Sequence, residues 1–441
     1  MSRSMAINGP SHVNGELSVP GDKSISHRVA LIAAVAEGAS RIEGFSSSAD
    51  CQTTLECVVR LGIRVERSPR ELIIHGNGLS GFQPPETAEA LQAGNSGSTI
   101  RLLSGLLSAQ HFASEIDGDA SLRRRPMTRI IDPLTRMGAH IESKDGCPPL
   151  RIFGQRLRGI AYQSPIASAQ VKSCVLLAGL LAEGRTTIAE PALSRNHTEL
   201  MLKEFGARIE REPANAWSVE GGGRLNPINY QVPGDISSAA FVISAAAALP
   251  NSRVVLSGVG LNPTRTAFLD VLRQLGARVT THDLQVRHGE PVGNLRAESS
   301  ELRCKSNKTT LSGRVIANLI DEIPIIAVLA TRVEGRIEVR EARELRVKES
   351  DRIRTVVDGI RSMGGEIEEF EDGFAINGPQ QLKGGLVESA GDHRIAMAFA
   401  IAGLFAEGTT EIRNADCASV SFPDFFEALA SLTGPGAVEI L

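Results

Sequence analysis

One short phrase recurs along the whole chain, and few folds accommodate such repetition. It reads LGIRVE from Leu61, MGAHIE from Met137, FGARIE from Phe205, LGARVT from Leu275, MGGEIE from Met363 and, in a weaker form, TGPGAVEI from Thr433. Each copy is typical of the end of a helix, a Gly in a left-handed conformation, and a strand with alternating side chains. Copies that recur about every seventy residues predict a protein built from one repeated unit.

A second pattern keeps step with the first, and it consists of a long apolar run, a turn and a β-branched strand. Clear copies occupy residues 29–44, 174–190, 325–341 and 395–414. Helices that are apolar on nearly every side belong inside a domain, where other elements cover them. Each unit is expected to have the order β, α, β, α, β, β. The six units open at Gly21, Gly94, Ser168, Gly234, Asp321 and Gly391.

The number of units predicts two lobes. A single core around all 441 residues would exceed the usual size of a domain, so we expect an α/β fold in which each lobe contains three βαβαββ units. The tetrapeptide VPGD occurs at residues 19–22 and again at 232–235, where the chain would pass between lobes. We therefore expect a first lobe at residues 21–234, and a second lobe at 235–441 that residues 1–20 complete. Two close crossings favour a hinge and a cleft that can shut.

The charge balance excludes some classes of partner. The chain carries 47 Lys and Arg against 51 Asp and Glu, which gives a formal net charge of −4. A protein that holds nucleic acid or an anionic membrane through an overall positive field needs the opposite sign. We expect neither kind of partner, and any bound anion must be held by local groups.

The termini and the cysteines indicate the compartment. The N-terminus, MSRSMAINGP, lacks the apolar core of a secretion signal, and the longest apolar run, AAFVISAAAALP, is too short to span a bilayer. The six Cys stand singly, without a CxxC pair or a Cys/His cluster. We expect a cytoplasmic protein without disulfides and without a metal site.

The turns that open the units gather polar side chains at the starts of apolar helices. The first turn offers Lys23, Ser24 and Arg28, the second reads AGNSGSTIR and includes Asn95 and Gly97, and others read SAQVKS, LIDEIP and GDHR. Small residues at a helix start leave backbone N–H groups free to face an anion. The fourth turn, VPGDISSAAF, carries no cation.

Further cations occur in LRRRP at residues 122–126 and in ELRVKESDR at residues 344–352. In the second segment Lys348 and Arg352 are four residues apart, so a helix there would place them on one face, where like charges are unfavourable unless an anion lies between them. Each feature alone could be an ordinary helix cap or a solvated face. Because cations recur at equivalent positions of several units, we favour one site for a small substrate with two anionic groups.

The motifs GDKSISHR, GNSGSTIRLL, RRRPM, SAQVKS, SRNHTE, LIDEIP, LRVKESDR, DHRIAM and SFPDFF, in this order, resemble the enolpyruvyl transferase family over essentially the whole chain. The resemblance implies two lobes of the inverse α/β barrel type with the active site in the cleft between them. It also implies transfer of the enolpyruvyl group of phosphoenolpyruvate to the 5-hydroxyl of shikimate 3-phosphate, with release of phosphate through a tetrahedral intermediate. Such an enzyme of the shikimate pathway is expected to be a monomer without a cofactor.

The resemblance assigns site residues motif by motif. Asp321 resembles the family's base toward the 5-hydroxyl, and Glu349 with Lys23 resembles its proton-transfer groups near phosphoenolpyruvate. For shikimate 3-phosphate, the implied contacts are Lys23, Ser24, Arg28, Ser168, Gln170, Arg195, Asp321 and Lys348. For phosphoenolpyruvate, they are Lys23, Asn95, Gly97, Arg125, Gln170, Arg352 and Arg394.

Two other interpretations stay open. A sister enzyme of the family transfers the same group to UDP-N-acetylglucosamine, but it opens with a Lys-Asn motif and usually has a cysteine in the loop that reads SLRRRPM here. A non-catalytic clamp of repeats around nucleic acid would need a basic chain. Ala169, Val420 and the SRNHTE segment resemble the family's other bacterial branch, and they leave the phosphoenolpyruvate contacts one cation short. Gly97 is retained, and sensitivity to the inhibitor glyphosate stays undecided.

Overall fold

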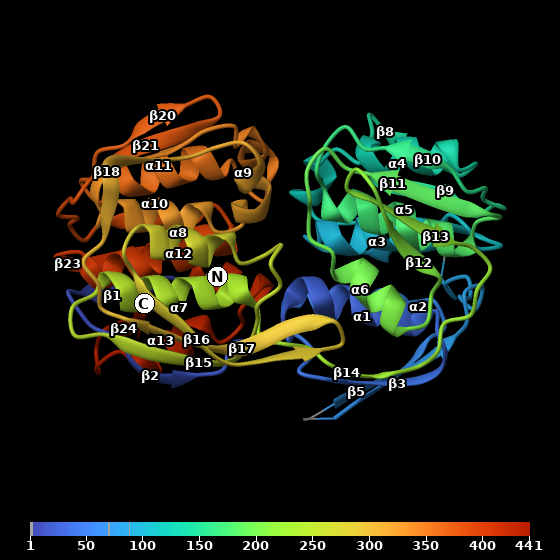
Figure 1. Ribbon diagram of the computed structural model, residues 1–441, viewed down its shortest axis with the longest axis horizontal. Coiled ribbons are helices and arrows are strands. Elements are labelled where there is room, and N and C mark those ends of the chain that lie inside the picture. Colours follow the sequence, from blue (N-terminus) through green and yellow to red (C-terminus); the bar gives the residue numbers. More distant parts are fainter. Residues whose placement is uncertain (1–2, 69–70, 88) are drawn as a thin grey trace. The chain divides into compact units, whose positions relative to one another are not determined.

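The computed structural model describes residues 3–68, 71–87 and 89–441 and divides into two compact units (Figure 1). The first lobe comprises Gly21–Val232 together with Val286–Glu290. The second lobe comprises the residues up to Pro20, Pro233–Gln285 and Pro291–Leu441. The boundary thus falls between Val232 and Pro233 rather than after Gly234, and the repeats do not predict that residues 286–290 join the first lobe.

The described strands of the first lobe form four-stranded sheets. The strands are β3 (Glu37–Glu43), β4 (Arg64–Arg67), β5 (Glu71–Asn77), β6 (Leu91–Gln92), β7 (Ala113–Asp117), β8 (His140–Lys144), β9 (Cys147–Phe153), β10 (Ala161–Gln163), β11 (Arg185–Ala189), β12 (Ile209–Glu212), β13 (Ala216–Glu220) and β14 (Asn229–Gln231). The sheet orders are β14-β3-β5-β4, β6-β7-β9-β8 and β10-β11-β13-β12. The helices are α1 (Lys23–Ala34), α2 (Ala49–Arg60), α3 (Gly97–Leu107), the short η1 (Leu122–Arg124), α4 (Thr128–Arg136), α5 (Ala169–Leu181) and α6 (His197–Glu204).

The second lobe repeats this organisation. Its strands are β1 (Met5–Gly9), β2 (Asn14–Leu17), β15 (Arg253–Gly260), β16 (Arg278–Arg287), β17 (Glu290–Glu298), β18 (Arg303–Leu311), β19 (Glu334–Val339), β20 (Glu368–Phe370), β21 (Gly373–Gly378), β22 (Leu386–Glu388), β23 (Gly408–Arg413) and β24 (Val438–Ile440). The sheet orders are β16-β17-β15-β2, β18-β19-β21-β20 and β22-β23-β1-β24. The helices are α7 (Ile236–Ala248), α8 (Ala267–Gln274), α9 (Arg314–Leu319), α10 (Ile323–Ala330), η2 (Arg343–Val347), α11 (Arg352–Ser362), α12 (His393–Phe405), η3 (Ala415–Val420) and α13 (Phe425–Leu432).

The long apolar runs form the inner helices of each lobe, which confirms the prediction. In the first lobe α3 contacts both α1 and α5, and in the second lobe α7, α10 and α12 contact one another. Every residue of α12 is buried. Each lobe has its own apolar cluster, because the buried side chains of one cluster all belong to one lobe. The sheets and the more amphipathic helices therefore cover helices that could not face water.

Side chains of the opening turns cap most of these inner helices. Asp22, Ser96, Ser168, Asp235 and Asp392 each accept a hydrogen bond from a backbone N–H in the first turn of the helix that follows. Such a cap stabilises a helix by about 1 kcal/mol. Part of the polarity of these turns is therefore structural, and the remaining side chains are available for other contacts.

The glycine of the recurring phrase is required by its backbone conformation. It ends a helix with a positive φ, a region that residues with a Cβ rarely adopt. The φ values are 83° at Gly62, 102° at Gly138, 86° at Gly206, 91° at Gly276 and 76° at Gly364. In the weaker copy, Gly436 also has a positive φ of 80°, but it lies beyond the end of α13 at Leu432. This geometry explains why the phrase keeps its Gly while the side chains around it vary.

Some strands join a sheet far from their place in the chain. β2 precedes α1 in sequence but pairs in parallel with β15, and β14 precedes α7 but pairs in parallel with β3. β1 pairs antiparallel with both β23 and β24, so the first strand of the chain is an interior strand of the last sheet. Segments on either side of each VPGD tetrapeptide thus complete sheets of different lobes.

The tip of the β16–β17 hairpin, residues 286–290, belongs to the first lobe. His288 stacks on Tyr230, with ring centroids 4.4 Å apart. Glu290 is buried, and its Oε1 lies 2.6 Å from Nδ1 of the buried His197 at the start of α6. A stacked ring and a buried hydrogen bond therefore fix this tip in the first lobe.

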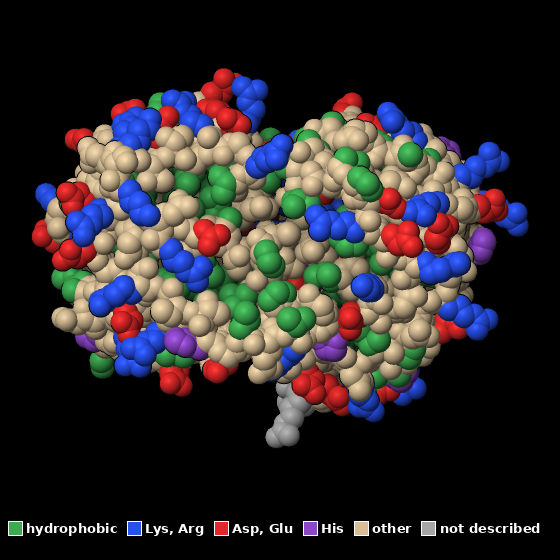
Figure 2. Space-filling view, in the orientation of Figure 1, with side chains coloured by type: hydrophobic (Ala, Val, Ile, Leu, Met, Phe, Trp, Pro, Cys, Tyr) green, Lys and Arg blue, Asp and Glu red, His purple; other side chains and the backbone are tan. Residues whose placement is uncertain are grey.

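The surface mixes charges of both signs. On the face drawn in Figure 2, Lys and Arg are interspersed with Asp and Glu over each lobe. Among the residues that the structure describes, none of the helices has both the length and the apolar character that crossing a membrane requires.

Candidate active site

The start of α1 gathers the predicted residues of the GDKSISHR motif. Arg28 is buried, with Nε donating to Thr198 Oγ1 at 2.7 Å and Nη1 donating to the carbonyl oxygen of Ser24 at 2.8 Å. Arg195, which precedes α6, donates from Nη1 to Ser24 Oγ at 3.2 Å. Lys23 Nζ lies 2.9 Å from Asp50 Oδ2 on α2. The structure thus brings together three cations and a hydroxyl from separate motifs.

A second group lies at the start of α3. Arg125 donates from Nη2 to Asn95 Oδ1 at 2.8 Å and from Nη1 to the Asn95 carbonyl oxygen at 3.3 Å. A Cβ added at Gly97 would lie 2.7 Å from Arg101 Nη1 and 3.5 Å from Arg125 Nη1. Two guanidinium groups therefore approach the backbone of Gly97, where the positive end of the helix also favours an anion.

The start of α5 is tied to this second group. Gln170 Oε1 accepts a hydrogen bond from Arg101 Nη1 at 2.6 Å, and Gln170 Nε2 donates to Ser98 Oγ at 2.9 Å. Ser168 caps α5 with its hydroxyl, and its backbone N–H donates to Glu190 Oε1 at 2.9 Å. Gln170 is therefore fixed between two helix starts of the first lobe, and both of its polar ends are engaged.

A buried histidine network also links α1 with α3. His27 Nδ1 lies 2.7 Å from Thr54 Oγ1, which lies 2.7 Å from Thr99 Oγ1. Burial, followed by the positive charges of Lys23 and Arg28, holds the pKa of His27 well below its ordinary value. The imidazole is thus neutral near pH 7 and joins the two helix starts without adding charge.

In the second lobe, Arg352 is the centre of a cluster of carboxylates. Its side chain is 1% exposed. Nε donates to Asp392 Oδ2 at 2.8 Å, Nη2 donates to Glu349 Oε2 at 2.6 Å, and Nη1 lies 3.5 Å from Asp321 Oδ1. Burial alone would lower the pKa of this guanidinium, but the three carboxylates outweigh burial and raise that pKa above its ordinary value.

Arg394 contacts the same aspartate from the start of α12. Its Nη1 donates to the carbonyl oxygen of Asp321 at 3.1 Å, and its Nε lies 3.4 Å from Asp321 Oδ1. The side chains of Asp321 and Glu349 are 15% and 17% exposed, whereas that of Asp392 is fully buried. Asp321 and Glu349 are therefore the carboxylates of this cluster that a small molecule can reach.

The structure corrects one prediction. Lys348 and Arg352 do not lie on one face of a helix, because Lys348 has an extended backbone after η2, and α11 begins only at Arg352. Asp351 caps α11 by accepting a hydrogen bond from the Arg354 N–H, and this cap sets the start of the helix. A spacing of four residues across a helix start carries no information about a shared face.

Sequence reasoning missed the groups that hold the predicted site residues in place. Asp392 anchors Arg352, Thr198 anchors Arg28, and Arg101 anchors Gln170. Each lies within or next to a motif already singled out, but nothing in their spacing reveals the partner, because the pairs are between 40 and 170 residues apart. The roles that the resemblance implies for the individual site residues stay predictions.

We expect Cys51 to be inert although it lies next to the site. Its Sγ contacts the carbonyl oxygen of Lys23 at 3.6 Å, and burial raises the pKa of the thiol to about 12. Near pH 8 only about one molecule in 10⁴ would carry the reactive thiolate. Iodoacetamide is therefore expected to leave turnover unchanged, with Cys51 unlabelled by mass spectrometry until the protein is unfolded in urea. Inactivation that parallels labelling of Cys51 and is slowed by substrate would contradict this.

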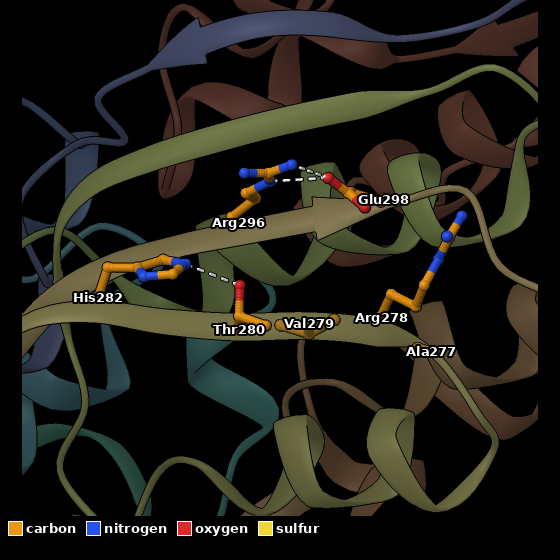
Figure 3. Close-up of a pocket in the computed structure, with 7 residues that line it drawn as sticks. All are labelled: Ala277, Arg278, Val279, Thr280, His282, Arg296 and Glu298. Carbon is orange, nitrogen blue, oxygen red and sulfur yellow. Dashed lines mark hydrogen bonds and ion pairs between the residues drawn. The ribbon is translucent and has the colours of Figure 1, made fainter.

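A separate hollow in the second lobe, with a volume of about 520 Å³, contains none of the predicted site residues (Figure 3). It is lined by residues of β16 and β17 and by Ala277. Most of its polar side chains pair with one another, since Arg296 Nε donates to Glu298 Oε1 at 2.7 Å and Thr280 Oγ1 lies 2.9 Å from His282 Nε2. Arg278 instead donates from Nε to the carbonyl oxygen of Ser299 at 3.0 Å. These contacts leave it a poor candidate for an anion site.

Six-unit architecture with lysine and arginine side chains at the starts of buried helices defines an enzyme that binds small anionic substrates. A family model described as EPSP synthase (3-phosphoshikimate 1-carboxyvinyltransferase) matches residues 7–429. The chain is 49% identical over 427 residues to the 3-phosphoshikimate 1-carboxyvinyltransferase of Koribacter versatilis, and the aligned region covers 97% of this chain and 98% of that protein. It is 46% identical over 424 residues to the enzyme of that name from Bacillus subtilis, with 96% and 97% covered.

A solved structure agrees with these relatives. The EPSP synthase of Acinetobacter baumannii matches with a TM-score of 0.87 and 42% sequence identity, and the match covers 100% of both chains. The chain belongs to the EPSP synthase family.

The comparisons confirm the main predictions drawn from the resemblance. The fold is the two-lobe inverse α/β fold, and the chain is a transferase of the shikimate pathway. The family acts on phosphoenolpyruvate and shikimate 3-phosphate, and neither the sugar-nucleotide enzyme nor the repeat clamp is favoured.

Proposed function

We propose that the side chains around Arg352, together with Lys23, carry out enolpyruvyl transfer to shikimate 3-phosphate in this protein. In the addition step, the 5-hydroxyl oxygen bonds to C2 of phosphoenolpyruvate, C3 gains a proton and the hydroxyl proton passes to a base. In the elimination step, C3 loses a proton, the double bond re-forms and the bond from C2 to the phosphate oxygen breaks. Two accessible carboxylates on one buried guanidinium are the observation that carries this proposal, since the reaction needs one base and one acid.

Asp321 is proposed as the base toward the 5-hydroxyl. Its Oδ1 lies 3.5 Å and 3.4 Å from Arg352 and Arg394, which is longer than the 2.8 Å contact that holds Asp392.

Glu349 and Lys23 are proposed as the groups that exchange a proton with C3. Glu349 accepts a short hydrogen bond from Arg352. An anionic substrate that engages the same guanidinium competes with this carboxylate, and its negative charge favours the protonated form of Glu349. Lys23, on the first lobe, supplies a second proton-transfer group and a cation for both substrates.

The remaining predicted contacts divide between the two substrates. We assign shikimate 3-phosphate to Lys23, Ser24, Arg28, Ser168, Gln170, Arg195, Asp321 and Lys348. Phosphoenolpyruvate is assigned to Lys23, Asn95, Gly97, Arg125, Gln170, Arg352 and Arg394. Two separate groups of these residues, one at the start of α1 and one at the start of α3, support a division between two substrates. Each group contains arginine, which forms bidentate hydrogen bonds with carboxylate and phosphate.

A pair of variants tests the division. Gly97→Ala adds a Cβ that would lie 2.7 Å from Arg101 Nη1, and Arg195→Gln removes a cation beside Ser24. We expect Gly97→Ala to raise the KM for phosphoenolpyruvate, and Arg195→Gln the KM for shikimate 3-phosphate, each about tenfold, with the other KM changed less than about threefold. Steady-state phosphate release at varied concentrations of each substrate measures both constants.

The control for this pair is Gly223→Ala, because no atom lies within 4 Å of a Cβ built there. It should match the unmodified enzyme in both constants. Equal effects of Gly97→Ala and Arg195→Gln on both substrates would refute the division.

We further propose a cytoplasmic monomer that needs no cofactor. All six cysteines are free thiols, as is usual in a reducing compartment. The arginines supply the positive charge that phosphate transfer reactions often take from a metal ion. Sedimentation velocity should give a single species of 47.0 kDa, and chelator treatment should leave phosphate release unchanged.

A further inference from the structure

The fourth opening turn, VPGDISSAAF, obtains its cation from another segment. Arg265, on the loop before α8, is buried, and its Nη2 donates to Ser237 Oγ at 2.8 Å. The same nitrogen lies 3.4 Å from Oδ1 of Asp235, the residue that caps α7. The protein's own side chains therefore occupy this helix start.

Ser237 connects this turn to the candidate base. Its Oγ donates a short hydrogen bond to Glu322 Oε1. Because Ser237 Oγ already accepts a hydrogen bond from Arg265, its own proton must point toward Glu322. Glu322 is buried and directly follows Asp321 at the start of α10. Burial, followed by the charge of Asp321, raises the pKa of Glu322, and the hydrogen bond from Ser237 opposes this shift and favours the ionised form.

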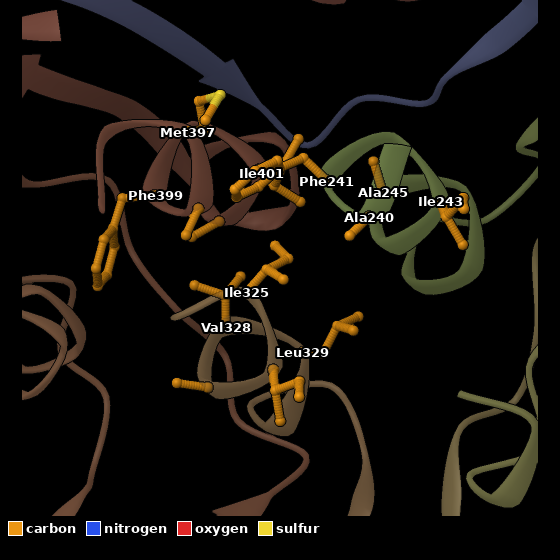
Figure 4. Packing of buried hydrophobic residues seen from close by; sticks show 14 of the residues in the cluster. Ala240, Phe241, Ile243, Ala245, Ile325, Val328, Leu329, Met397, Phe399 and Ile401 are labelled. Carbon is orange, nitrogen blue, oxygen red and sulfur yellow. The ribbon is translucent and has the colours of Figure 1, made fainter. Parts of the chain in front are cut away.

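Two helices thus hold these two residues, one through the backbone of Asp321 and the other through the side chain of Glu322. Arg394 of α12 donates to the carbonyl oxygen of Asp321 at 3.1 Å, while Ser237 of α7 holds the side chain of Glu322. Helices α7, α10 and α12 pack together through apolar side chains, including Phe241 on α7 and Ile325 on α10 (Figure 4). Apolar packing alone does not fix the rotation of a short helix end, whereas a directional hydrogen bond does.

We propose that Ser237 and Glu322 are positioning residues that set the orientation of Asp321 for catalysis. This inference rests on the proposed role of Asp321 as the base. A displacement of about 1 Å at a reacting group can cost about a hundredfold in rate. The fourth unit, whose opening turn carries no cation, would then contribute to the reaction by orienting a residue of the fifth unit.

The test compares kcat and KM in variants of the full chain. Ser237→Ala and Glu322→Leu should lower kcat about tenfold or more, with KM for both substrates changed less than about threefold. Glu322→Gln keeps an oxygen that accepts the bond from Ser237, so its kcat should stay within about threefold of the parent enzyme. The matched control is Ser244→Ala, because Ser244 is a buried serine on α7 whose hydroxyl donates to its own helix at Ala240 O.

Thermal melting and Asp321→Asn complete the design. Folded Ser237→Ala and Glu322→Leu proteins with normal kcat, or with raised KM alone, would overturn the inference. If neither Ser237→Ala nor Glu322→Leu folds, Glu322→Gln provides the test. A folded Glu322→Gln protein keeps the oxygen that accepts from Ser237, so a kcat as low as that of Asp321→Asn would refute positioning by this hydrogen bond. Full turnover by Asp321→Asn would instead refute the proposed base, whereas a slow Asp321→Asn beside a fast Ser237→Ala would refute the positioning role alone.

Discussion

Asp321→Asn is expected to lower kcat by about 10²–10⁴-fold, the usual contribution of a general base. The amide keeps the size of the side chain and can still accept hydrogen bonds from Arg352 and Arg394, which lie 3.5 Å and 3.4 Å from Oδ1. It cannot take the hydroxyl proton at neutral pH. The KM for each substrate should therefore change little, and single-turnover phosphate release should be slowed as much as steady-state release.

Asp270→Asn is the control for this substitution. Asp270 lies on α8 with its side chain 65% exposed, so the same chemical change there should leave kcat unaltered. A large rise in the KM for shikimate 3-phosphate at normal kcat would mean that Asp321 only binds the substrate. That result would remove it from the proton-transfer step.

Arg352→Met should abolish detectable turnover and also destabilise the protein. The substitution removes the cation that three carboxylates share. Asp392 is fully buried, and the side chains of Glu349 and Asp321 are only 17% and 15% exposed. Removing one partner of a buried ion pair costs about 3–5 kcal/mol. Chemical denaturation should show this loss near pH 7.

Arg354→Met provides a matched control on the same helix. The side chain of Arg354 is 56% exposed and pairs with Asp358 one turn further along α11. Exposed pairs of this kind contribute little to stability. Loss of the same stability in both variants would mean that α11 as a whole, rather than the buried cluster, determines the effect.

Much of the fold could be predicted because it depends on local patterns. A Gly in the left-handed region and a long apolar run leave a signal within ten or twenty residues, and both recur in step along the chain. The caps at Asp22, Ser96 and Asp235 belong to the same local signal. Repetition then turns a weak local prediction into a strong one, because independent errors would not keep the same spacing.

The parts that sequence reasoning missed depend on contacts between distant segments. The hydrogen bond from Arg265 to Ser237 and the ion pair of Arg352 with Asp392 join residues 28 and 40 positions apart. The prediction that Lys348 and Arg352 share a helical face was wrong for a different, local reason. Their spacing fits a helix, but α11 begins only at Arg352, and Lys348 before it has an extended backbone. Site residues could be named by motif, but the groups that orient them could not.

The place of β1 inside the last sheet also bears on how the chain folds during synthesis. The ribosome releases Met5–Gly9 long before the partner strands of that segment, which are Gly408–Arg413 and Val438–Ile440. The first lobe draws nearly all its residues from the continuous stretch Gly21–Val232, so it can fold while the rest is still being made. A ribosome stalled before residue 408 should therefore display a protease-resistant first lobe and an N-terminal strand that proteases still cut.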